Sequence, residues 1–182
     1  MYRLKKMASF AKGTILDIGF TDQPNRFLRG EVYGLDINKP VSVPSNYKGF
    51  LVHDAMKLTT IKERYDTILA GEIIEHLEKP HEFISGCYEI LNPGGILVIS
   101  TPNPYYFPIA SLEMLMIRRF FYARDHVNLY LPRFLVRMME RYKFSNVRIH
   151  SGGVDLPIVK TNIFFPFPFC GLTIYVGHKG EP

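Results

Sequence analysis

The chain has 182 residues, 47% of them hydrophobic, and a formal net charge of +5. This length and apolar content predict a single domain, spanning residues 1–182, with a sizeable buried core. No apolar run reaches the roughly 18–20 residues that cross a bilayer, which argues against a transmembrane segment. The modest positive charge permits an anionic partner but does not demand one.

The cysteines and the N-terminal residues bear on the compartment. Cys87 and Cys170 have neither metal-binding nor disulfide spacing. Residues 1–12 include basic side chains but no long apolar stretch before a small-residue cleavage site, so we expect no signal peptide. Together these features predict a cytoplasmic protein in a reducing environment.

Apolar, β-branched runs alternate with segments of helical periodicity through the first two thirds of the chain. The expected strands are residues 14–19, 31–36, 49–52, 66–70, 96–100, 147–150 and 172–176. The expected helices are residues 2–11, a short one from 21 or 22 to about 28, and residues 80–91, 110–121 and 132–142. This alternation predicts an α/β fold, a Rossmann-like doubly wound sheet that is mostly parallel and covered on both faces.

Small or acidic residues stand at or near the carboxyl ends of the first four expected strands: Gly19, Asp36, Asp54 and Gly71, with Asp17 just inside the first. Ligands of such folds bind at these strand ends, and an acidic group after the second strand can accept both hydroxyls of an adenosine ribose. Asp54 can accept from an adenine amino group, and Gly19 lets the backbone approach a ligand closely. Each residue alone has an ordinary reading as a turn or cap residue. Their occurrence in order, at successive strand ends, favours a nucleoside site.

Six blocks of the sequence resemble motifs of class I S-adenosylmethionine (SAM) dependent methyltransferases, from about residue 13 to residue 144. In motif order they are Thr14–Gly19, Gly34–Asp36, His53–Ala55, Tyr65–Pro80, Leu91–Leu97 and Asp125–Arg133. Residues 75–80 and 92–97 are the most specific, because they look like the fourth- and fifth-strand signatures of the small-molecule branch, the type 11 and ubiquinone-biosynthesis-like enzymes.

The resemblance implies a seven-stranded sheet whose last strand is antiparallel, with SAM as the cofactor. It implies methyl transfer to a small-molecule, saccharide or lipid-like acceptor, with O-methylation favoured. The residues that we expect to contact SAM are Asp17, Gly19, Asp36, Asp54, Ala55 and Gly71.

The glycine motif after the first strand departs from the family pattern Asp-x-Gly-x-Gly-x-Gly. Thr21 and Gln23 stand at the second and third glycine positions, and their Cβ atoms narrow the space for the methionine part of SAM. The alternative is therefore a catalytically inactive, methyltransferase-like binding or partner subunit, either with another chain or as a homo-oligomer. An NAD-dependent oxidoreductase is a weaker alternative, because the Gly-x-Gly-x-x-Gly phosphate loop is absent.

The segment Glu72–His76 resembles the Glu-x-x-Glu-His segment of ubiquinone-biosynthesis O-methyltransferases, which implies a divalent-metal role for Glu72, Glu75 and His76. Two carboxylates and an imidazole can bind a cation that lowers the pKa of an acceptor hydroxyl. We favour the simpler interpretation, in which these side chains brace the loop after the fourth strand and no metal binds.

His126 is the candidate catalytic residue. An imidazole titrates near neutrality and can take a proton from a hydroxyl or an amine. Asp125 can fix its tautomer if the fold brings the two side chains together. The alternative is a surface histidine packed against Tyr130. No nucleic-acid-binding module is evident, which favours a small-molecule or lipid-like acceptor.

Overall fold

The computed structural model describes residues 1–114, 126–156 and 161–180. These residues form an eight-stranded sheet in the order β3-β2-β1-β4-β5-β8-β6-β7. The strands are β1 Thr14–Ile18, β2 Glu31–Asp36, β3 Gly49–Val52, β4 Tyr65–Gly71, β5 Leu91–Pro102, β6 Phe144–Leu156, β7 Thr161–Ile163 and β8 Leu172–Lys179. The pairs β2–β3, β1–β2, β1–β4 and β4–β5 are parallel.

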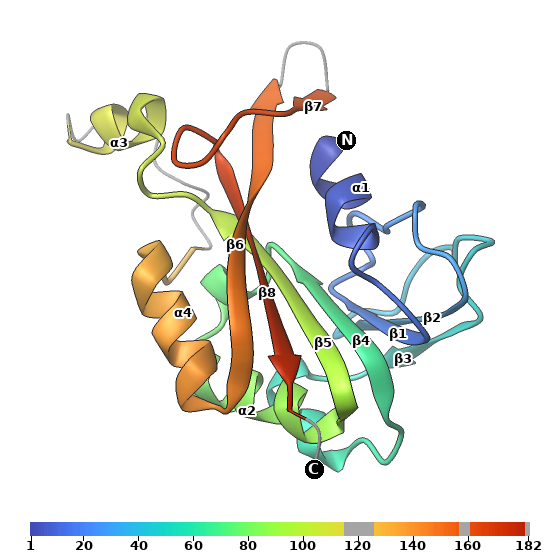
Figure 1. Cartoon of the computed structure of the whole chain (residues 1–182). Helices are drawn as coiled ribbons and strands as arrows, with labels where there is room; N and C mark the ends of the chain where they lie inside the picture. The colour runs from blue at the N-terminus through green and yellow to red at the C-terminus, as the bar shows by residue number, and fades with distance from the viewer. Residues whose placement is uncertain (115–125, 157–160, 181–182) are drawn as a thin grey trace.

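The last strand lies antiparallel between its neighbours, as the family resemblance implies. β8 inserts between β5 and β6 and pairs with both in the antiparallel sense. The short strand β7 was not expected. It has three residues and pairs with the far end of β6, which at 13 residues extends past the body of the sheet (Figure 1).

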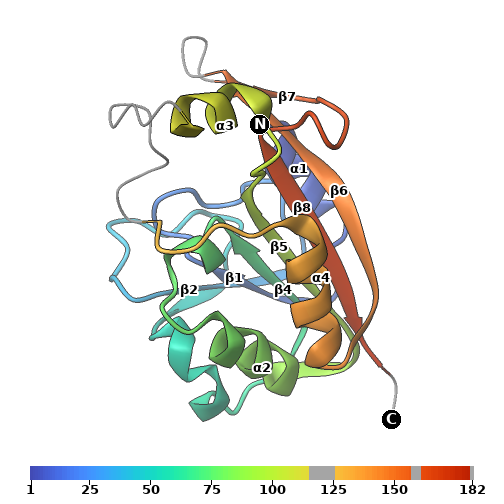
Figure 2. The same ribbon diagram turned by 90° about the vertical axis from the view of Figure 1, so that its left-hand side faces the viewer.

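In the described part of the chain, helices cover both faces of this sheet, and one further helix, Phe107–Met114, lies beyond the strand ends (Figure 1). The helices are α1 Tyr2–Ala8, α2 Pro80–Ile90, α3 Phe107–Met114 and α4 Pro132–Arg141, with 3-10 turns η1 Ala55–Thr60 and η2 Ile74–His76. α2 and α4 cover one face and α1 the other (Figures 1 and 2). The helices predicted at 80–91 and 132–142 are confirmed; each starts with proline at its first position, where a missing N–H costs nothing.

The helix predicted at residues 21–28 is wrong, because that segment forms turns in the structure. Pro24 lacks a backbone donor, and the side chain of Asn25 accepts a hydrogen bond from the N–H of Phe27 at 3.1 Å, which stabilises a turn instead of a helix. The segment still contributes to the core, because Leu28 is 1% exposed on the α1 face of the sheet, as is Phe20 just before it.

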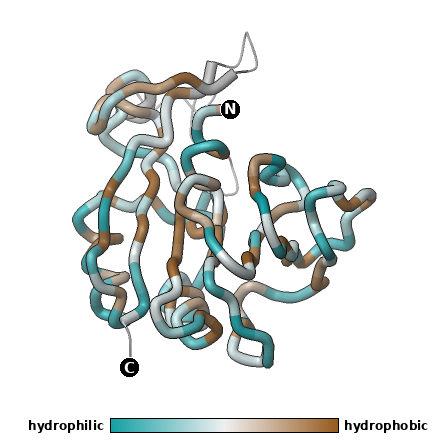
Figure 3. The backbone as a smooth tube through the Cα atoms, turned by 45° about the vertical axis from the view of Figure 1, so that its right-hand side comes forward, coloured by the Kyte–Doolittle hydropathy of each residue, from teal (hydrophilic) through white to brown (hydrophobic). Residues whose placement is uncertain are grey.

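The buried core has two parts, one on each face of the sheet. On one face, the apolar stripes of α2 and α4 pack on side chains of the central strands. On the other face, apolar residues of α1 and of the turns before β2 and β3 pack on the strands. Figure 3 shows the hydrophobic residues concentrated along the strands in the middle of the molecule. Among the described residues, no helix is both long and apolar enough to cross a membrane.

The carboxyl ends of the five parallel strands share one edge of the sheet. Strand order reverses at β1, which lies between β2 and β4. A reversal of this kind leaves a crevice outside the strand ends, where the connections diverge to opposite faces. The topology therefore directs attention to the residues that follow β1, β2, β3 and β4.

Candidate functional site

A cavity of about 220 Å³ lies at the carboxyl ends of these four strands. Its lining comes from the end of each strand in turn: Ile18, Gly19, Asp22, Leu35, Asp36, Ile37, Asp54, Ala55, Ile73, His76 and Leu77. Gly19, Asp36, Asp54 and Ala55, predicted separately from the sequence, are thus brought together around one space. Asp17 and Gly71 are not among the lining residues.

Gly19 adopts a backbone conformation that favours glycine, with φ +75°. Its N–H donates to the carbonyl of Leu35 at 2.8 Å, which carries the β1–β2 pairing to the cavity. A Cβ at this position would lie 2.1 Å from Cδ1 of Ile73. The space above Gly19 is therefore filled by Ile73, itself a wall of the cavity.

Asp36 is fixed by backbone donors on both sides. Its Oδ2 accepts from the N–H of Thr21 at 3.2 Å, and its Oδ1 accepts from the N–H of Asn38 at 3.0 Å. An ionised carboxylate has about four acceptor sites. Two of them remain for a ligand in the cavity, so Asp36 is held in place and still able to bind.

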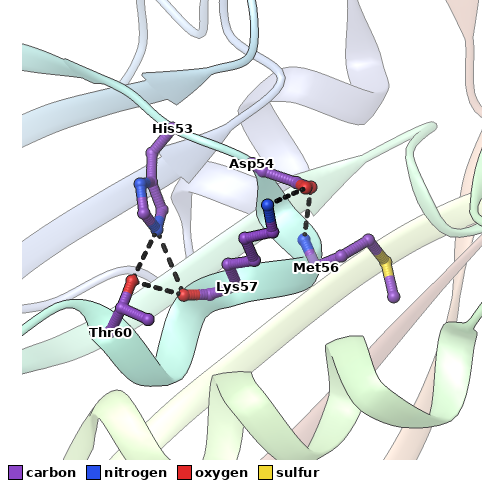
Figure 4. Close-up of polar contacts among 5 residues, drawn as sticks. All are labelled: His53, Asp54, Met56, Lys57 and Thr60. Atoms are coloured by element: carbon purple, nitrogen blue, oxygen red, sulfur yellow. Dashed lines mark hydrogen bonds and ion pairs between the residues drawn. The ribbon is translucent and has the colours of Figure 1, made fainter.

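Asp54 caps the 3-10 turn η1 beside the cavity. Its Oδ1 accepts from the N–H of Met56 at 2.8 Å, and its Oδ2 lies 3.9 Å from Nζ of Lys57 (Figure 4). The ring of His53 contacts the Thr60 hydroxyl and the Lys57 carbonyl, both at 3.1 Å, and so ties the two ends of the turn. These contacts hold the start of the turn in place, so that Asp54 and Ala55 line the cavity.

Asp17 lies on the other side of β1 from the cavity. It is 6% exposed and accepts a hydrogen bond from the Tyr47 hydroxyl at 2.5 Å, and so holds the turn before β3 against the sheet. Burial raises the pKa of Asp17 to about 6, although the Tyr47 hydrogen bond and the charge of Arg3 oppose the shift. The structure therefore gives Asp17 a role in holding loops, which the sequence did not predict.

The raised pKa of Asp17 should make the free energy of unfolding depend on pH. A carboxyl whose pKa is raised in the folded protein destabilises it above that pKa, and the penalty disappears as pH falls from about 6 towards 4. We expect the unfolding free energy of wild type minus that of Asp17→Asn to rise by about 2 kcal/mol between pH 7 and pH 4. Urea unfolding of both proteins across this range measures it. Parallel curves for the two proteins would contradict it.

Gly71 lies next to the buried arginine Arg3, which no sequence pattern predicted. Arg3 on α1 is 7% exposed, and its guanidinium contacts the hydroxyl of Ser100 at 2.9 Å, a Glu72 carboxylate oxygen at 3.4 Å and the side-chain carbonyl of Gln23. A Cβ on Gly71 would lie 3.1 Å from Arg3 Nη1. Gln23, at a lost glycine position, is thus used to hold a cation beside the ends of β4 and β5. No local pattern in residues 2–8 signals this contact.

Glu72 lies apart from the other two residues of the metal set that the family resemblance implies. Its φ is +58°, and its carboxylate is held by Arg3 and by the Ser100 hydroxyl at 3.0 Å. Glu75 and His76 instead lie with His126, and one ligand atom from each of these three residues lies within 4.8 Å of the other two. In the described part of the chain, Glu75 and His76 thus group with His126, and Glu72 groups with Arg3.

His126 reaches Glu75 because its segment is bound to the turn after β4. The N–H groups of Val127 and Asn128 both donate to the Glu75 carbonyl at 3.0 Å. The rings of His76 and His126 meet edge to face with centroids 4.7 Å apart. Asp125, the expected orienting group, lies outside the described residues. Tyr130, the expected packing partner, donates to the Ile74 carbonyl at 3.3 Å.

Burial makes the Glu75 carboxyl unusual. It is 1% exposed, and burial, followed by the charge of Glu72, raises its pKa well above the usual range. A buried carboxyl next to two imidazoles is a grouping that binds protons or cations readily. His76 also lines a second cavity of about 410 Å³, which adjoins the first and shares Asp54 and Leu77 with it.

The sequence matches the methyltransferase-domain family over residues 4–149. It is 31% identical over 118 residues to the ubiquinone biosynthesis O-methyltransferase of Cereibacter sphaeroides (strain ATCC 17029 / ATH 2.4.9), which covers 56% of this chain and 48% of that protein. The protein of the same name from Dinoroseobacter shibae is 33% identical over 121 residues, which covers 59% of this chain and 49% of that protein. The chain thus spans about half the length of these curated relatives.

Solved structures share the fold over nearly the whole chain. A SAM-dependent methyltransferase from Archaeoglobus fulgidus superposes with a TM-score of 0.69 at 20% identity, covering 97% of this chain and 91% of that one. A putative methyltransferase, solved in complex with the Haloferax volcanii Trm112 methyltransferase activator, superposes with a TM-score of 0.70 at 16% identity. The match covers 100% of this chain and 90% of that one. At these identities the structures show the fold alone. With the family match over most of its length, the chain belongs to the class I SAM-dependent methyltransferases, whose cofactor is SAM.

Proposed function

We propose that this protein transfers a methyl group from SAM to a hydroxyl group of a small-molecule, saccharide or lipid-like acceptor. The observation that carries the proposal is the cavity at the strand ends, which Gly19, Asp36, Asp54 and Ala55 line together. The relatives named as O-methyltransferases support oxygen as the methylated atom.

Each part of SAM has a candidate partner at these strand ends. Asp36 is positioned for the ribose hydroxyls, and Asp54 and Ala55 for the adenine. Arg3 is the candidate for the methionine carboxylate, because it is a buried cation next to Gly71. Asp17 holds the turn before β3 through its hydrogen bond with the Tyr47 hydroxyl. Methyl transfer from a sulfonium is an in-line displacement, so aligning the two reactants supplies most of the catalysis.

The acceptor side is assigned to the cluster of Glu75, His76 and His126. We place the acceptor hydroxyl beside His126, our candidate catalytic residue, where the hydroxyl loses its proton as the methyl group arrives. His76 supports this placement, because it belongs to the cluster and also lines the cavity.

Calorimetry with SAM and S-adenosylhomocysteine, with NAD as a control, tests the proposal. We expect micromolar binding of the two sulfur ligands and none of NAD. Methyl transfer from radiolabelled SAM to a panel of phenols, saccharides and hydroxylated lipids then identifies the acceptor class. Binding of NAD alone would favour an oxidoreductase instead.

The role of Arg3 makes a separate prediction. Arg3→Gln should weaken S-adenosylhomocysteine binding about tenfold, because one charge-assisted contact to its carboxylate is lost. Binding of methylthioadenosine, which has no amino-acid carboxylate, should change little. Calorimetry with both ligands measures the difference. Equal losses for the two ligands would show that Arg3 acts only by shaping the site.

A partner subunit is the second candidate. It is supported by Thr21 and Gln23 in place of glycines and by the Haloferax volcanii neighbour, which was solved with an activator protein. A folded protein that binds neither SAM nor S-adenosylhomocysteine would favour it. We further propose a single domain, since every described strand joins one sheet, and a cytoplasmic location, since both cysteines are free.

A further inference from the structure

Three side chains from two distant segments converge beside the cavity. Glu75 and His76 belong to the turn after β4, and His126 comes from the segment that precedes α4. One ligand atom from each residue lies within 4.8 Å of the other two. Ligands of a four-coordinate zinc ion, at bonds of about 2.1 Å, are roughly 3.4 Å apart. Small side-chain rotations would therefore close the three groups around one ion.

The Glu75 carboxylate needs a partner that the described part of the chain does not provide. The residue is 1% exposed, and within the described ranges neither carboxylate oxygen has a hydrogen bond of normal geometry, although the Thr101 side chain contacts the carboxyl. A buried carboxylate without hydrogen bonds is costly, and such groups are usually paired with a cation or coordinate a metal. Among the described residues, the buried cation Arg3 makes its ion pair with Glu72, at 3.4 Å, and not with Glu75.

The backbone keeps this cluster in place. The Glu75 carbonyl accepts from Val127 and Asn128, and the Asn128 side chain donates to the Leu77 carbonyl at 2.6 Å. These bonds hold His126 next to the turn without using the three side chains themselves. A site with its backbone fixed in advance loses less entropy when it binds an ion.

We propose that Glu75, His76 and His126 form a binding site for one divalent first-row transition-metal ion, and that Glu72 is not among its ligands. Two imidazoles with one carboxylate suit zinc and its neighbours, whereas magnesium prefers a shell of oxygen atoms. Three protein ligands leave a position open, as in catalytic zinc sites. An ion there would act as a Lewis acid that lowers the pKa of a coordinated hydroxyl. The inference rests on the cluster and holds whether or not the protein methylates.

Metal binding by the full chain, measured without SAM, tests the inference. After treatment with a chelator, the protein should bind one Zn²⁺ with micromolar or tighter affinity in competition with a chromophoric chelator, and millimolar Mg²⁺ should not compete. Bound Co²⁺ should give visible d–d absorption. Absence of Zn²⁺ binding, or displacement by Mg²⁺, would overturn the inference.

Variants locate the ion within the chain. Glu75→Gln, His76→Ala and His126→Ala should each weaken Zn²⁺ binding about 100-fold or more. The control His81→Ala, which removes an exposed histidine outside the cluster, should keep the wild-type affinity. Glu72→Gln should weaken Zn²⁺ binding far less than the three ligand variants, because it removes a nearby negative charge but no ligand. Loss of binding in Glu72→Gln with retention in His126→Ala would favour the set Glu72, Glu75 and His76, which the family resemblance implies, and reject ours.

A measurement on the wild-type chain covers the case in which a variant fails to fold. Of the six histidines, only His76 and His126 should shift their ring carbon–proton NMR signals when one equivalent of Zn²⁺ is added. Shifts spread over other histidines would refute a defined site. S-adenosylhomocysteine binding, measured on the same samples, reports separately on the proposed methyl transfer.

Discussion

Asp36→Ala is expected to lower the affinity for SAM and S-adenosylhomocysteine about 100-fold. The two carboxylate oxygens of Asp36 are held by Thr21 and Asn38 at the cavity wall, and the ribose hydroxyls are the proposed donors to the lone pairs that remain. Two hydrogen bonds to a charged acceptor contribute about 3 kcal/mol together, which corresponds to roughly two orders of magnitude in Kd. Calorimetry with S-adenosylhomocysteine measures the change.

The matched control is Glu63→Ala, which removes an exposed carboxylate near the start of β4, at the opposite edge of the sheet. Its affinity should equal that of wild type. Thermal unfolding of both variants separates a local loss of binding from a loss of fold, because Asp36 also accepts two backbone hydrogen bonds. Unchanged affinity in a folded Asp36→Ala protein would remove Asp36 from the cofactor site.

Gly19→Ala is expected to lower the unfolding free energy by about 3 kcal/mol and Tm by roughly 10 °C. Two costs add: the positive φ of +75°, which costs an L-residue roughly 1–2 kcal/mol, and the clash of the new Cβ with Ile73 at 2.1 Å. Because Ile73 lines the cavity, its displacement should also weaken cofactor binding. Urea unfolding and calorimetry measure the two effects.

A double-mutant cycle with Ile73→Ala divides the two costs. Ile73→Ala removes the atoms that the new Cβ meets, so Gly19→Ala should cost less in that background, by about 1–2 kcal/mol. The part caused by the positive φ should remain. If Gly19→Ala costs the same in both backgrounds, contact with Ile73 is not the reason that glycine stands at this position.

Local sequence patterns predicted the elements whose environment is uniform along their length. β1 and β4 are rich in apolar residues because both faces of the sheet are covered, and α2 has one apolar face because only one side of it packs. The strand ends then predicted Gly19, Asp36 and Asp54, because parallel strands bring their carboxyl ends to one edge. These features depend only on neighbours in sequence and on the rule for parallel sheets.

The tertiary structure alone decided which side chains meet across the chain. Successive strand residues point to opposite faces, so whether Asp17 or its neighbours face the cavity depends on which face the helices cover. The arrival of Arg3 at Glu72 and of His126 at Glu75 depends on where α1 and the segment before α4 cross the sheet. The sequence therefore determined the sheet and the edge at which we propose that the cofactor binds, whereas the cluster of Glu75, His76 and His126 arises from contacts between distant segments, which no local pattern encodes.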